Sequence, residues 1–399
     1  MKIPYNLLTI VFLAASVPLA WLMLQRDSAA PVKVVRFASF NVSLHRKQAG
    51  QLLAELESGD SEQAGRIAEI VQRIAPDVLL LCEVDRDDAE RAAEVFAERY
   101  LAVGRNGQQG IDFPFRYCGP VNTGVASGLD LDGDGRSDGP GDAWGYGAHP
   151  GQYGMVVLSR HPILVDRVRT FQKLRWQRMP DNSRPPGFWP DATWEQLRLS
   201  SKSHWDVPIG IGQVERGHVI HLLCSHPTPP AFDGDEDRNG RRNHDEIRFW
   251  VDYLTPGRGD WIVDDDGLAG GLASDASFVI AGDLNCDPVD GGSRSEALRA
   301  LLAHQRVQDP RPRSDGADLA AKREWGSNAT HKGDAALDTG DFGDEPGKGP
   351  GNLRVDYVLP SADLAVQASG VFWPPPHDPA ARLLSASDHR LVWVDVRTN

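Results

Sequence analysis

Carboxylate, amide and imidazole side chains recur in this chain where apolar, strand-like runs begin or end. Six segments share this arrangement: Phe40-Asn41, Cys82-Glu83, Ser225-His226, Gly282-Asp283-Leu284-Asn285, Val355-Asp356-Tyr357 and Ser387-Asp388-His389. A single Asp, Asn or His after a strand is more often a turn residue or a helix cap than a ligand. The same residue types at six strand ends favour one shared site.

These residue types meet the requirements of phosphoester hydrolysis. The reaction needs a hard cation, a group that prepares water, and donors directed at the charge that develops on phosphorus. Three residues offer oxygen ligands to a cation such as Mg²⁺ or Mn²⁺: Asn41, Glu83 and Asp388. Asp283 and His389 can transfer protons, and His226 and Asn285 can donate hydrogen bonds.

Apolar runs predict the elements that position these residues. Predicted strands cover 32–42, 78–83, 153–159, 165–171, 219–225, 278–282, 354–359 and 391–396. Predicted helices cover 65–74, 87–103, 245–254 and 295–302. Because pairs of strands separate the helices, we expect an α+β fold with two packed sheets and helices outside. No repeat or long linker divides the chain, so residues 31–399 are expected to form one catalytic domain.

The order of the motifs resembles that of the endonuclease/exonuclease/phosphatase superfamily. The resemblance runs from about Val34 to Val396, and its most specific parts are the late motifs GDLN, VDYVL and SDH. It implies a four-layered α/β sandwich, in which helices flank two packed mixed β-sheets and the active site lies at one edge of the paired sheets. It also implies a metal-dependent phosphoric ester hydrolase, a phosphodiesterase, phosphatase or nuclease.

The resemblance assigns a role to each position. Asn41 and Glu83 match the metal-binding residues of the family, and Asp388 matches the Asp of its closing Asp-His pair. His226 matches the first active-site histidine, although Pro227 stands where a leucine is usual. Asp283 and Asn285 match the residues that orient the nucleophile and hold phosphate oxygens. His389 matches the final histidine of the closing pair, and Asp356 matches the Asp that accepts a hydrogen bond from it. The implied mechanism is in-line attack of water, with His389 as the base and Asp356 fixing its tautomer.

The N-terminus differs from the rest of the chain. Lys2 precedes an apolar stretch from Tyr5 to Leu24, and small residues stand at Ser28 and Ala30. This pattern predicts that residues 1–30 are a signal peptide cleaved after Ala30. An uncleaved membrane anchor is the alternative, because the stretch is nearly long enough to span a bilayer. Either way, we expect the mature chain outside the cytoplasm, whether secreted, periplasmic or anchored.

Two irregular stretches interrupt the predicted elements. Residues 104–151 are rich in Gly and Asp, and residues 173–203 carry Trp176, Trp189 and Trp194 among Arg and Pro residues. Normal Trp burial favours a hydrophobic lid on the sheet. A lipid-touching wedge and a substrate clasp are the alternatives, and three arginines could meet phosphate: Arg175, Arg178 and Arg184.

Two acidic segments match parts of a calcium-loop pattern. Asp130–Asp138 has the alternating spacing without a closing Glu, and Asp235–Glu246 has oxygen donors at the expected positions. Structural Ca²⁺ at either place is one interpretation. A solvated loop at the first, and a turn that caps the helix from Asp245 at the second, are the alternatives.

The net charge of −14 argues against a broad electrostatic grip on nucleic acid. Together with the long insertions, it favours a small-molecule or lipid-headgroup phosphoester as the substrate of a monomeric enzyme. A secreted endonuclease on DNA or RNA is one alternative. An anchored, calcium-stabilised surface binding protein with a lapsed site is another. Cys82 and Cys224 fall in strand-like runs and are expected to be free, while a Cys118–Cys286 bridge is left open.

Overall fold

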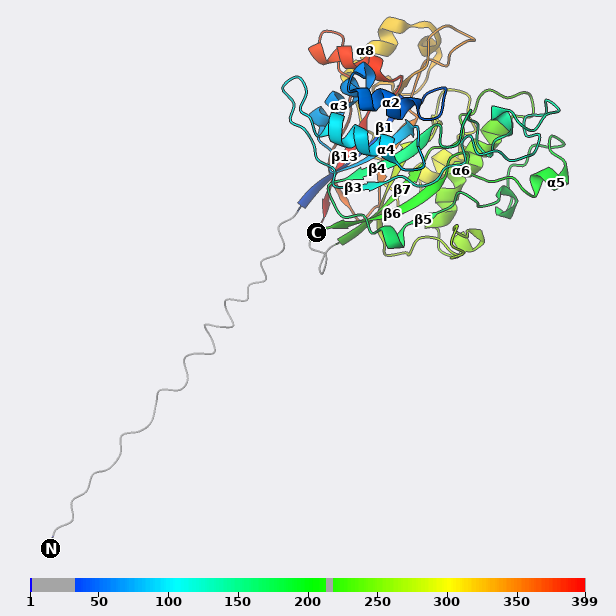
Figure 1. The fold of residues 1–399 in the computed structure, drawn as a ribbon, viewed down its shortest axis with the longest axis horizontal. Helices are drawn as coiled ribbons and strands as arrows, with labels where there is room; N and C mark the ends of the chain where they lie inside the picture. Colours follow the sequence, from blue (N-terminus) through cyan, green and yellow to red (C-terminus); the bar gives the residue numbers. More distant parts are fainter. Residues whose placement is uncertain (2–32, 213–217, 399) are drawn as a thin grey trace. The chain divides into compact units, whose positions relative to one another are not determined.

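The computed structural model describes residue 1 and residues 33–212 and 218–398. Val34–Thr398 forms one compact unit, and the predicted signal peptide lies outside the described residues apart from Met1. Among those residues, no helix has the length and apolar character needed to cross a membrane. Figure 1 shows the ribbon of this unit.

The first sheet has six strands in the order β12-β13-β1-β2-β4-β3. The strands are β1 (Lys33–Leu44), β2 (Val78–Val84), β3 (Phe115–Tyr117), β4 (Gly154–Ser159), β12 (Ala365–Val371) and β13 (Val392–Thr398). β1 pairs with β2 in parallel, whereas β2 pairs with β4 and β12 pairs with β13 in antiparallel fashion. The sheet is therefore mixed.

The second sheet has five strands in the order β11-β8-β7-β6-β5. The strands are β5 (Arg169–Thr170), β6 (His204–Ile211), β7 (His218–Ser225), β8 (Ser277–Asp283) and β11 (Asp356–Pro360). β7 and β8 are parallel, and the other pairs are antiparallel. A separate two-stranded ribbon joins β9 (Gly340–Asp341) to β10 (Asn352–Leu353).

Alternate residues of the strands enter different hydrophobic cores, as the period of two of a strand requires. In β1, Phe37 faces the core between the sheets and Phe40 faces the core beneath the helices. In β8, Val279 faces the inter-sheet core, and Phe278 packs into a third core on the outer face. These three cores separate four layers, so the predicted four-layered sandwich is confirmed.

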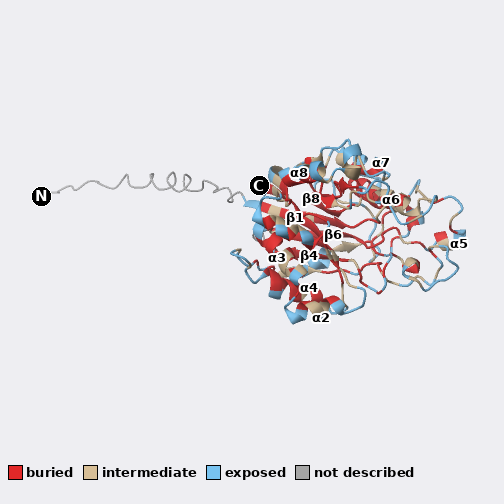
Figure 2. Ribbon diagram, turned by 90° about the horizontal axis from the view of Figure 1, so that it is seen from above, coloured by how far each residue is buried: buried red, intermediate tan, exposed pale blue. Residues whose placement is uncertain are grey.

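Helices cover both outer faces of the sandwich. Figure 2 shows α2 (Gln51–Ser58), α3 (Glu62–Ile74) and α4 (Arg91–Phe96) on one side, and α6 (Arg238–Leu254) and α7 (Glu296–Leu302) on the other. Short α5 (Asp191–Trp194) belongs to the second insertion. α8 (Asp315–Glu324) adds Ala317 and Ala320 to the core between the sheets.

Some predicted elements differ from the structure. Residues 165–171 are not a full strand, because a 3-10 turn at Val165–Arg167 leaves only the two residues of β5. β6 and β12 were not predicted, and α6 begins at Arg238 rather than at Asp245. All four cysteines are free and buried, so Cys118 and Cys286 form no bridge.

The tryptophans of the second insertion form a packed lid. Trp176, Trp189 and Trp194 are buried and lie with ring centroids 5.0–6.2 Å apart. The Trp189 indole donates to the Leu131 carbonyl oxygen at 3.0 Å, which ties the second insertion to the first. The lipid-wedge alternative is wrong, because these rings are inside the molecule.

Arg175, Arg178 and Arg184, the three arginines considered as phosphate contacts, bond within the protein. The guanidinium groups donate to carbonyl oxygens of nearby residues, and Arg184 also pairs with Asp191. These contacts give the arginines a structural role in holding the lid, which the sequence interpretation as phosphate ligands did not anticipate.

Candidate active site

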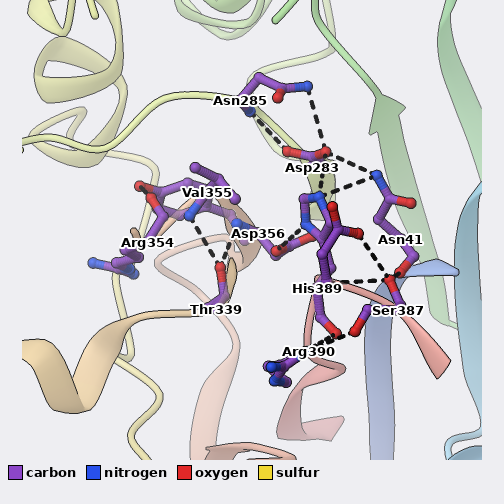
Figure 3. Close-up of polar contacts among 12 residues, drawn as sticks. Asn41, Asp283, Asn285, Thr339, Arg354, Val355, Asp356, Ser387, His389 and Arg390 are labelled. Carbon is purple, nitrogen blue, oxygen red and sulfur yellow. Dashed lines mark hydrogen bonds and ion pairs between the residues drawn. The ribbon is translucent and has the colours of Figure 1, made fainter. Parts of the chain in front are cut away.

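Strand ends of both sheets meet at one edge of the sandwich. The register of the first sheet places Asn41 of β1 beside Cys82 of β2, one residue before Glu83. In the second sheet, Asp283 at the end of β8 pairs directly with Asp356 at the start of β11. The side chains of Asn41, Asp283, Asp356 and His389 point toward one another in Figure 3.

The Asp356–His389 pair is the most regular part of this arrangement. The Nδ1 atom of His389 lies 2.9 Å from Asp356 Oδ2, which is the predicted hydrogen bond. The Thr339 hydroxyl oxygen accepts from the amides of Val355 and Asp356 at 3.0 and 2.9 Å, and so fixes the start of β11. The other ring nitrogen of His389, Nε2, lies 3.7 Å from Asp283 Oδ2.

Asn41 connects two carboxylates that come from different sheets. Its Nδ2 atom donates to Glu83 Oε1 and to Asp283 Oδ2, both at 3.0 Å. Its Oδ1 atom accepts from the Ser43 amide at 3.2 Å. In this orientation Asn41 clamps Glu83 and Asp283, and a ligand role would require its amide oxygen to turn toward the cation.

Glu83 projects from an irregularity in β2. The pairing of β2 with both neighbours shifts register around this residue, and its φ of 61° lies in the left-handed region. A bulge of this kind re-aims one side chain and is common beside active sites. The carboxylate is only half-buried, and its Oε2 atom lies 3.5 Å from His45 Nε2.

His45 is a site residue that the sequence analysis missed. It follows the end of β1, and its ring lies 4.5 Å from the Tyr153 ring at the mouth of the site. The available signal was another polar residue beyond a strand end, four positions after Asn41.

His226 lies at the centre without hydrogen bonds. Its Nε2 atom is 3.4 Å from Asp283 Oδ2 and 3.9 Å from Glu83 Oε1, but neither ring nitrogen has a hydrogen-bond partner among the described residues. Burial lowers the pKa of His226 well below its ordinary value, which favours the neutral ring. A neutral imidazole facing the centre can donate to an incoming oxygen.

Asn285 holds the loop after β8. It has a φ of 51°, its amide N–H donates to Asp283 Oδ1 at 2.9 Å, and its Nδ2 atom donates to the Pro227 carbonyl oxygen at 3.1 Å. It therefore connects Asp283 to the loop that follows His226. Gly282 of the same motif allows the close approach to β7, because a Cβ there would collide with the Ser225 carbonyl oxygen.

Asp388 lies outside the cluster that Asp283, Asp356 and His389 form. Its side chain is exposed and accepts from the Ser43 hydroxyl at 3.2 Å. The carboxylate and imidazole atoms of Asp283, Asp356 and His389 lie within 4.8 Å of one another, and Asp388 is not part of this group. The adjacent position in the sequence turns its side chain outward while His389 turns inward.

Lys202 is a second residue that the sequence analysis missed. It is buried just before β6, and no hydrogen bond or ion pair of its ammonium is found among the described residues. Burial lowers the pKa of Lys202, and the charges of Glu83 and Glu246 oppose that change. It lies in the second insertion, so tertiary folding alone brings it to the site.

The electrostatics concern His389, which the resemblance expects to act as the base. Burial alone would lower the pKa of His389, but the charges of Asp356 and Asp283 outweigh it and raise the pKa to about 10. Burial raises the pKa of Asp283, and His389 opposes that rise. These charges favour a protonated His389, which donates rather than accepts, and they leave Asp283 as the acceptor.

The donor chemistry of the centre fits a hard divalent cation. Carboxylate oxygens of Glu83 and Asp283 and the amide group of Asn41 come together, and no cysteine thiol competes because all four are buried and protonated. Oxygen donors of this kind suit Mg²⁺ or Mn²⁺.

The two calcium-like segments differ from each other. Oxygens of Asp130, Asp132 and Asp134 lie within 4.8 Å of one another, and backbone amides of the same loop donate to them. In the second segment, Glu246 lies inside α6 and accepts from the amides of Ser201 and Thr228. The calcium-loop interpretation of Asp235–Glu246 is therefore wrong.

Comparisons with known proteins agree with this geometry. A sequence model of the Endonuclease/Exonuclease/phosphatase family matches residues 38–389. No curated protein sequence matches the chain. A solved endonuclease/exonuclease/phosphatase from Beutenbergia cavernae is similar in fold, with 18% identity, a TM-score of 0.48, and coverage of 92% of this chain and 72% of that chain.

Two further solved structures are similar at low identity. Sphingomyelinase C from Streptomyces griseocarneus has 16% identity and a TM-score of 0.43, with coverage of 91% of this chain and 99% of that chain. A Bacteroides thetaiotaomicron mannosyl-6-phosphatase has 12% identity, the same TM-score and the same coverage. Because the family match extends over most of the sequence, the chain belongs to the endonuclease/exonuclease/phosphatase family, whose members are metal-dependent phosphoester hydrolases.

Proposed function

We propose that this chain hydrolyses a phosphoester by in-line attack of water at the edge where the two sheets meet. One observation carries the proposal. Asp283 lies between Asn41 on one side and the Asp356-supported His389 on the other, with the unpartnered His226 at 3.4 Å. This arrangement brings a proton acceptor, a positive donor and a neutral donor together.

Each residue has a proposed part in the reaction. Asp283 orients water and accepts its proton, and the amide N–H of Asn285 holds its carboxylate in place. His389, fixed by Asp356, and His226 donate hydrogen bonds to the non-bridging phosphate oxygens. Glu83 and Asn41 would hold the Mg²⁺ or Mn²⁺ ion, which supplies Lewis-acid stabilisation of the departing oxygen.

The surroundings favour a small phosphoester or a lipid headgroup over a polymer. The chain has a net charge of −14, and a pocket of about 680 Å³ opens beside Glu83 under the two insertions. Gripping a duplex backbone requires clustered basic side chains on an open surface. Cleavage of nucleic acid is the alternative outcome of the test below.

The test is a panel of phosphomonoesters, phosphodiesters, phospholipids and nucleic acids, assayed with and without chelator. The expected result is turnover of a small ester that EDTA abolishes and added Mg²⁺ or Mn²⁺ restores. His389→Gln should lose this turnover, while the matched His377→Gln variant should keep it. Turnover that persists in chelator, or none with any ester, would contradict the proposal.

We also propose that the enzyme acts outside the cytoplasm. The charged start, apolar stretch and small residues before position 31 support this location. Fractionation of expressing cells, with N-terminal sequencing of the product, is the test. A cytoplasmic product that retains its N-terminal residues would contradict export, and an exported product that retains them would favour an anchor.

A further inference from the structure

The pocket beside Glu83 is continuous with the catalytic centre. Its volume of about 680 Å³ is in the range of small-molecule sites. Glu83 Oε2 lies 3.5 Å from His45 Nε2, and the His45 ring lies 4.5 Å from the Tyr153 ring. Glu83 and Tyr153 both belong to the pocket wall. Because the proposed cation ligand is part of this wall, the alcohol portion of an ester held at the centre can extend into the pocket.

The basic side chains of the wall already have opposite charges or acceptors inside the protein. The Arg242 guanidinium donates to three backbone carbonyl oxygens at 2.7–3.0 Å. Arg238 pairs with Glu236. Carboxylates neighbour Lys202, and the charge of Glu83 has the strongest influence on it among them. These three cations therefore require no negative group from the alcohol portion of a substrate.

Other polar groups of the wall are also occupied or covered. The hydroxyl oxygens of Thr123, Ser201 and Thr228 have almost no accessible surface, so they do not face the pocket. The Asn239 side-chain nitrogen donates to the Ala231 carbonyl oxygen at 2.6 Å. The two indole groups of the wall donate to protein oxygens at 2.7 and 3.0 Å. The wall consequently offers few free hydrogen-bonding groups to a ligand.

Most of the exposed lining of the pocket is apolar. Leu131 and Leu197 contribute to it, and so do the rings of Tyr146 and Phe232, whose exposed fractions are 65% and 90%. An exposed phenylalanine ring beside a pocket leaves apolar surface in water, and a bound apolar group would cover it. The Asp132 carboxylate and the tyrosine hydroxyls add a few polar atoms, as is usual in sites for largely apolar ligands.

On these observations, and resting on the proposed function, we infer that the pocket binds the alcohol portion of the substrate and that this portion is an apolar alkyl or aryl group. An apolar group covers the exposed lining and needs no hydrogen bonds. Each hydroxyl of a sugar would instead lose its water and find few free partners in the wall. Discrimination then comes from hydrophobic burial, where one methylene group changes kcat/KM by roughly 10- to 200-fold.

The experiment compares the purified chain, in Mg²⁺, on two esters that differ in polarity and not in length. Hexyl phosphate is compared with diethylene glycol monophosphate, whose chain has the same number of non-hydrogen atoms, each as the monoester and as its methyl diester. The ether oxygen makes diethylene glycol the better leaving group, so reactivity alone cannot favour the hexyl ester. The hexyl esters should have at least about tenfold higher kcat/KM. Equal values, or higher values for diethylene glycol esters or for glucose 6-phosphate, would overturn the inference.

Two further esters distinguish the sources of an apolar group. Phenylpropyl phosphate carries an aryl group, and dihexanoyl phosphatidylcholine, used below its micelle concentration, carries acyl chains. A higher kcat/KM for the phospholipid than for the hexyl and phenylpropyl esters would assign the pocket to a lipid, and the reverse order would assign it to a simple alkyl or aryl alcohol. Values for all three at or below that of the diethylene glycol ester would overturn the inference.

Variants of an exposed residue locate the preference in the pocket with little risk to folding. Phe232→Ala should raise KM for the hexyl ester about fivefold more than for the diethylene glycol ester, because the hexyl chain alone gains from covering the ring. Phe232→Leu should restore most of the preference. Trp325→Ala is the matched control, because its ring is also exposed and is not part of the pocket wall. An equal effect of Phe232→Ala on both esters would overturn the inference.

Tyr146→Ala should act in the same direction with a smaller effect, since the Tyr146 ring is less exposed than that of Phe232. The proposed function fails separately, if none of these esters is hydrolysed in Mg²⁺ or Mn²⁺. Hydrolysis of the hexyl and diethylene glycol esters with the same kcat/KM rejects only the pocket inference.

Discussion

The catalytic edge and the pocket beside it are built in different ways. At the edge, strand register brings the side chains together, and Asn41, Asp283, Asp356 and His389 form a connected chain of contacts. In the pocket, segments far apart in the sequence supply a wall that includes Trp176 and Trp189. Strand pairing organises the edge, whereas the pocket depends on how the two insertions pack.

The difference also appears in what supports each region. Backbone pairing across β8 and β11 holds the edge. Side-chain packing holds the tryptophan lid, formed by Trp176, Trp189 and Trp194, together, and the Trp189 indole donates to the Leu131 carbonyl oxygen. Trp176 and Trp189 of this lid are part of the pocket wall. Substitutions at the edge should therefore lower catalytic activity with little loss of stability. Substitutions in the tryptophan lid should lower stability more than catalytic activity.

The largest effect is expected from Glu83→Gln at the edge. Removal of the carboxylate charge should lower kcat/KM at limiting Mg²⁺ by at least about 100-fold, because the cation contributes several kcal/mol of charge stabilisation. The melting temperature should stay near the wild-type value, since Glu83 is half-buried and is not part of the hydrophobic cores of the described residues. Glu62→Gln, on the exposed face of α3, is the control. Wild-type turnover at limiting Mg²⁺ would show that Glu83 does not bind the cation.

Asp356→Asn should lower kcat by about 10- to 100-fold, with a smaller change of KM, because it removes the group that orients His389. The substitution also has a signed effect on pH dependence. The Asp356 charge raises the pKa of His389, so its loss should move the alkaline limb of the kcat profile to lower pH. Asp166→Asn, at an exposed turn, is the control. An alkaline limb that stays at the same pH would show that Asp356 does not raise the pKa of His389.

In the tryptophan lid, Trp189→Ala should reduce the free energy of unfolding by about 3–5 kcal/mol, the usual cost of deleting a buried large aromatic ring. Chemical denaturation measures this loss. The matched control is Trp325→Ala, whose ring is exposed. If both variants unfold at the same denaturant concentration, packing of Trp189 in the lid does not stabilise the protein.

The smallest effect concerns Asp338, in the segment that carries Thr339 behind the edge. Burial, with the charges of Asp287 and Asp290, raises the pKa of Asp338 to about 8. Because the pKa of Asp338 is higher in the folded protein than its ordinary value of 3.8, the folded state loses stability as the pH rises from 3.8 to about 8. Asp338→Asn should therefore stabilise the protein by roughly 1–3 kcal/mol above pH 8, with little gain near pH 4. A gain independent of pH would contradict the burial of a charge.

The edge could be predicted from the sequence because strand ends are local features. A run of apolar residues defines each strand, and the polar residue that follows it must lie at the end of the sheet. β6 was missed because Pro208 and Gly210 interrupt its pattern. In the structure both face the segment 162–164, where Pro208 needs only its carbonyl oxygen, which accepts from Leu164.

Other features depend on contacts that no local pattern contains. The first turns of α6 were missed because its buried residues there are polar, and Asn243 and Glu246 bond to backbone groups of distant loops. Lys202 reaches the site only after the second insertion folds over the edge. The raised pKa of His389 was also beyond the sequence, because it depends on the distances to two carboxylates.

The central claim is tested most directly by anomalous scattering from crystals grown in Mn²⁺. We predict one strong peak in contact with the Glu83 carboxylate, at the edge and beside the pocket, and its loss in Glu83→Gln crystals. A peak at Asp130–Asp134 in the first insertion, with none near Glu83, would show that Glu83 does not hold the cation.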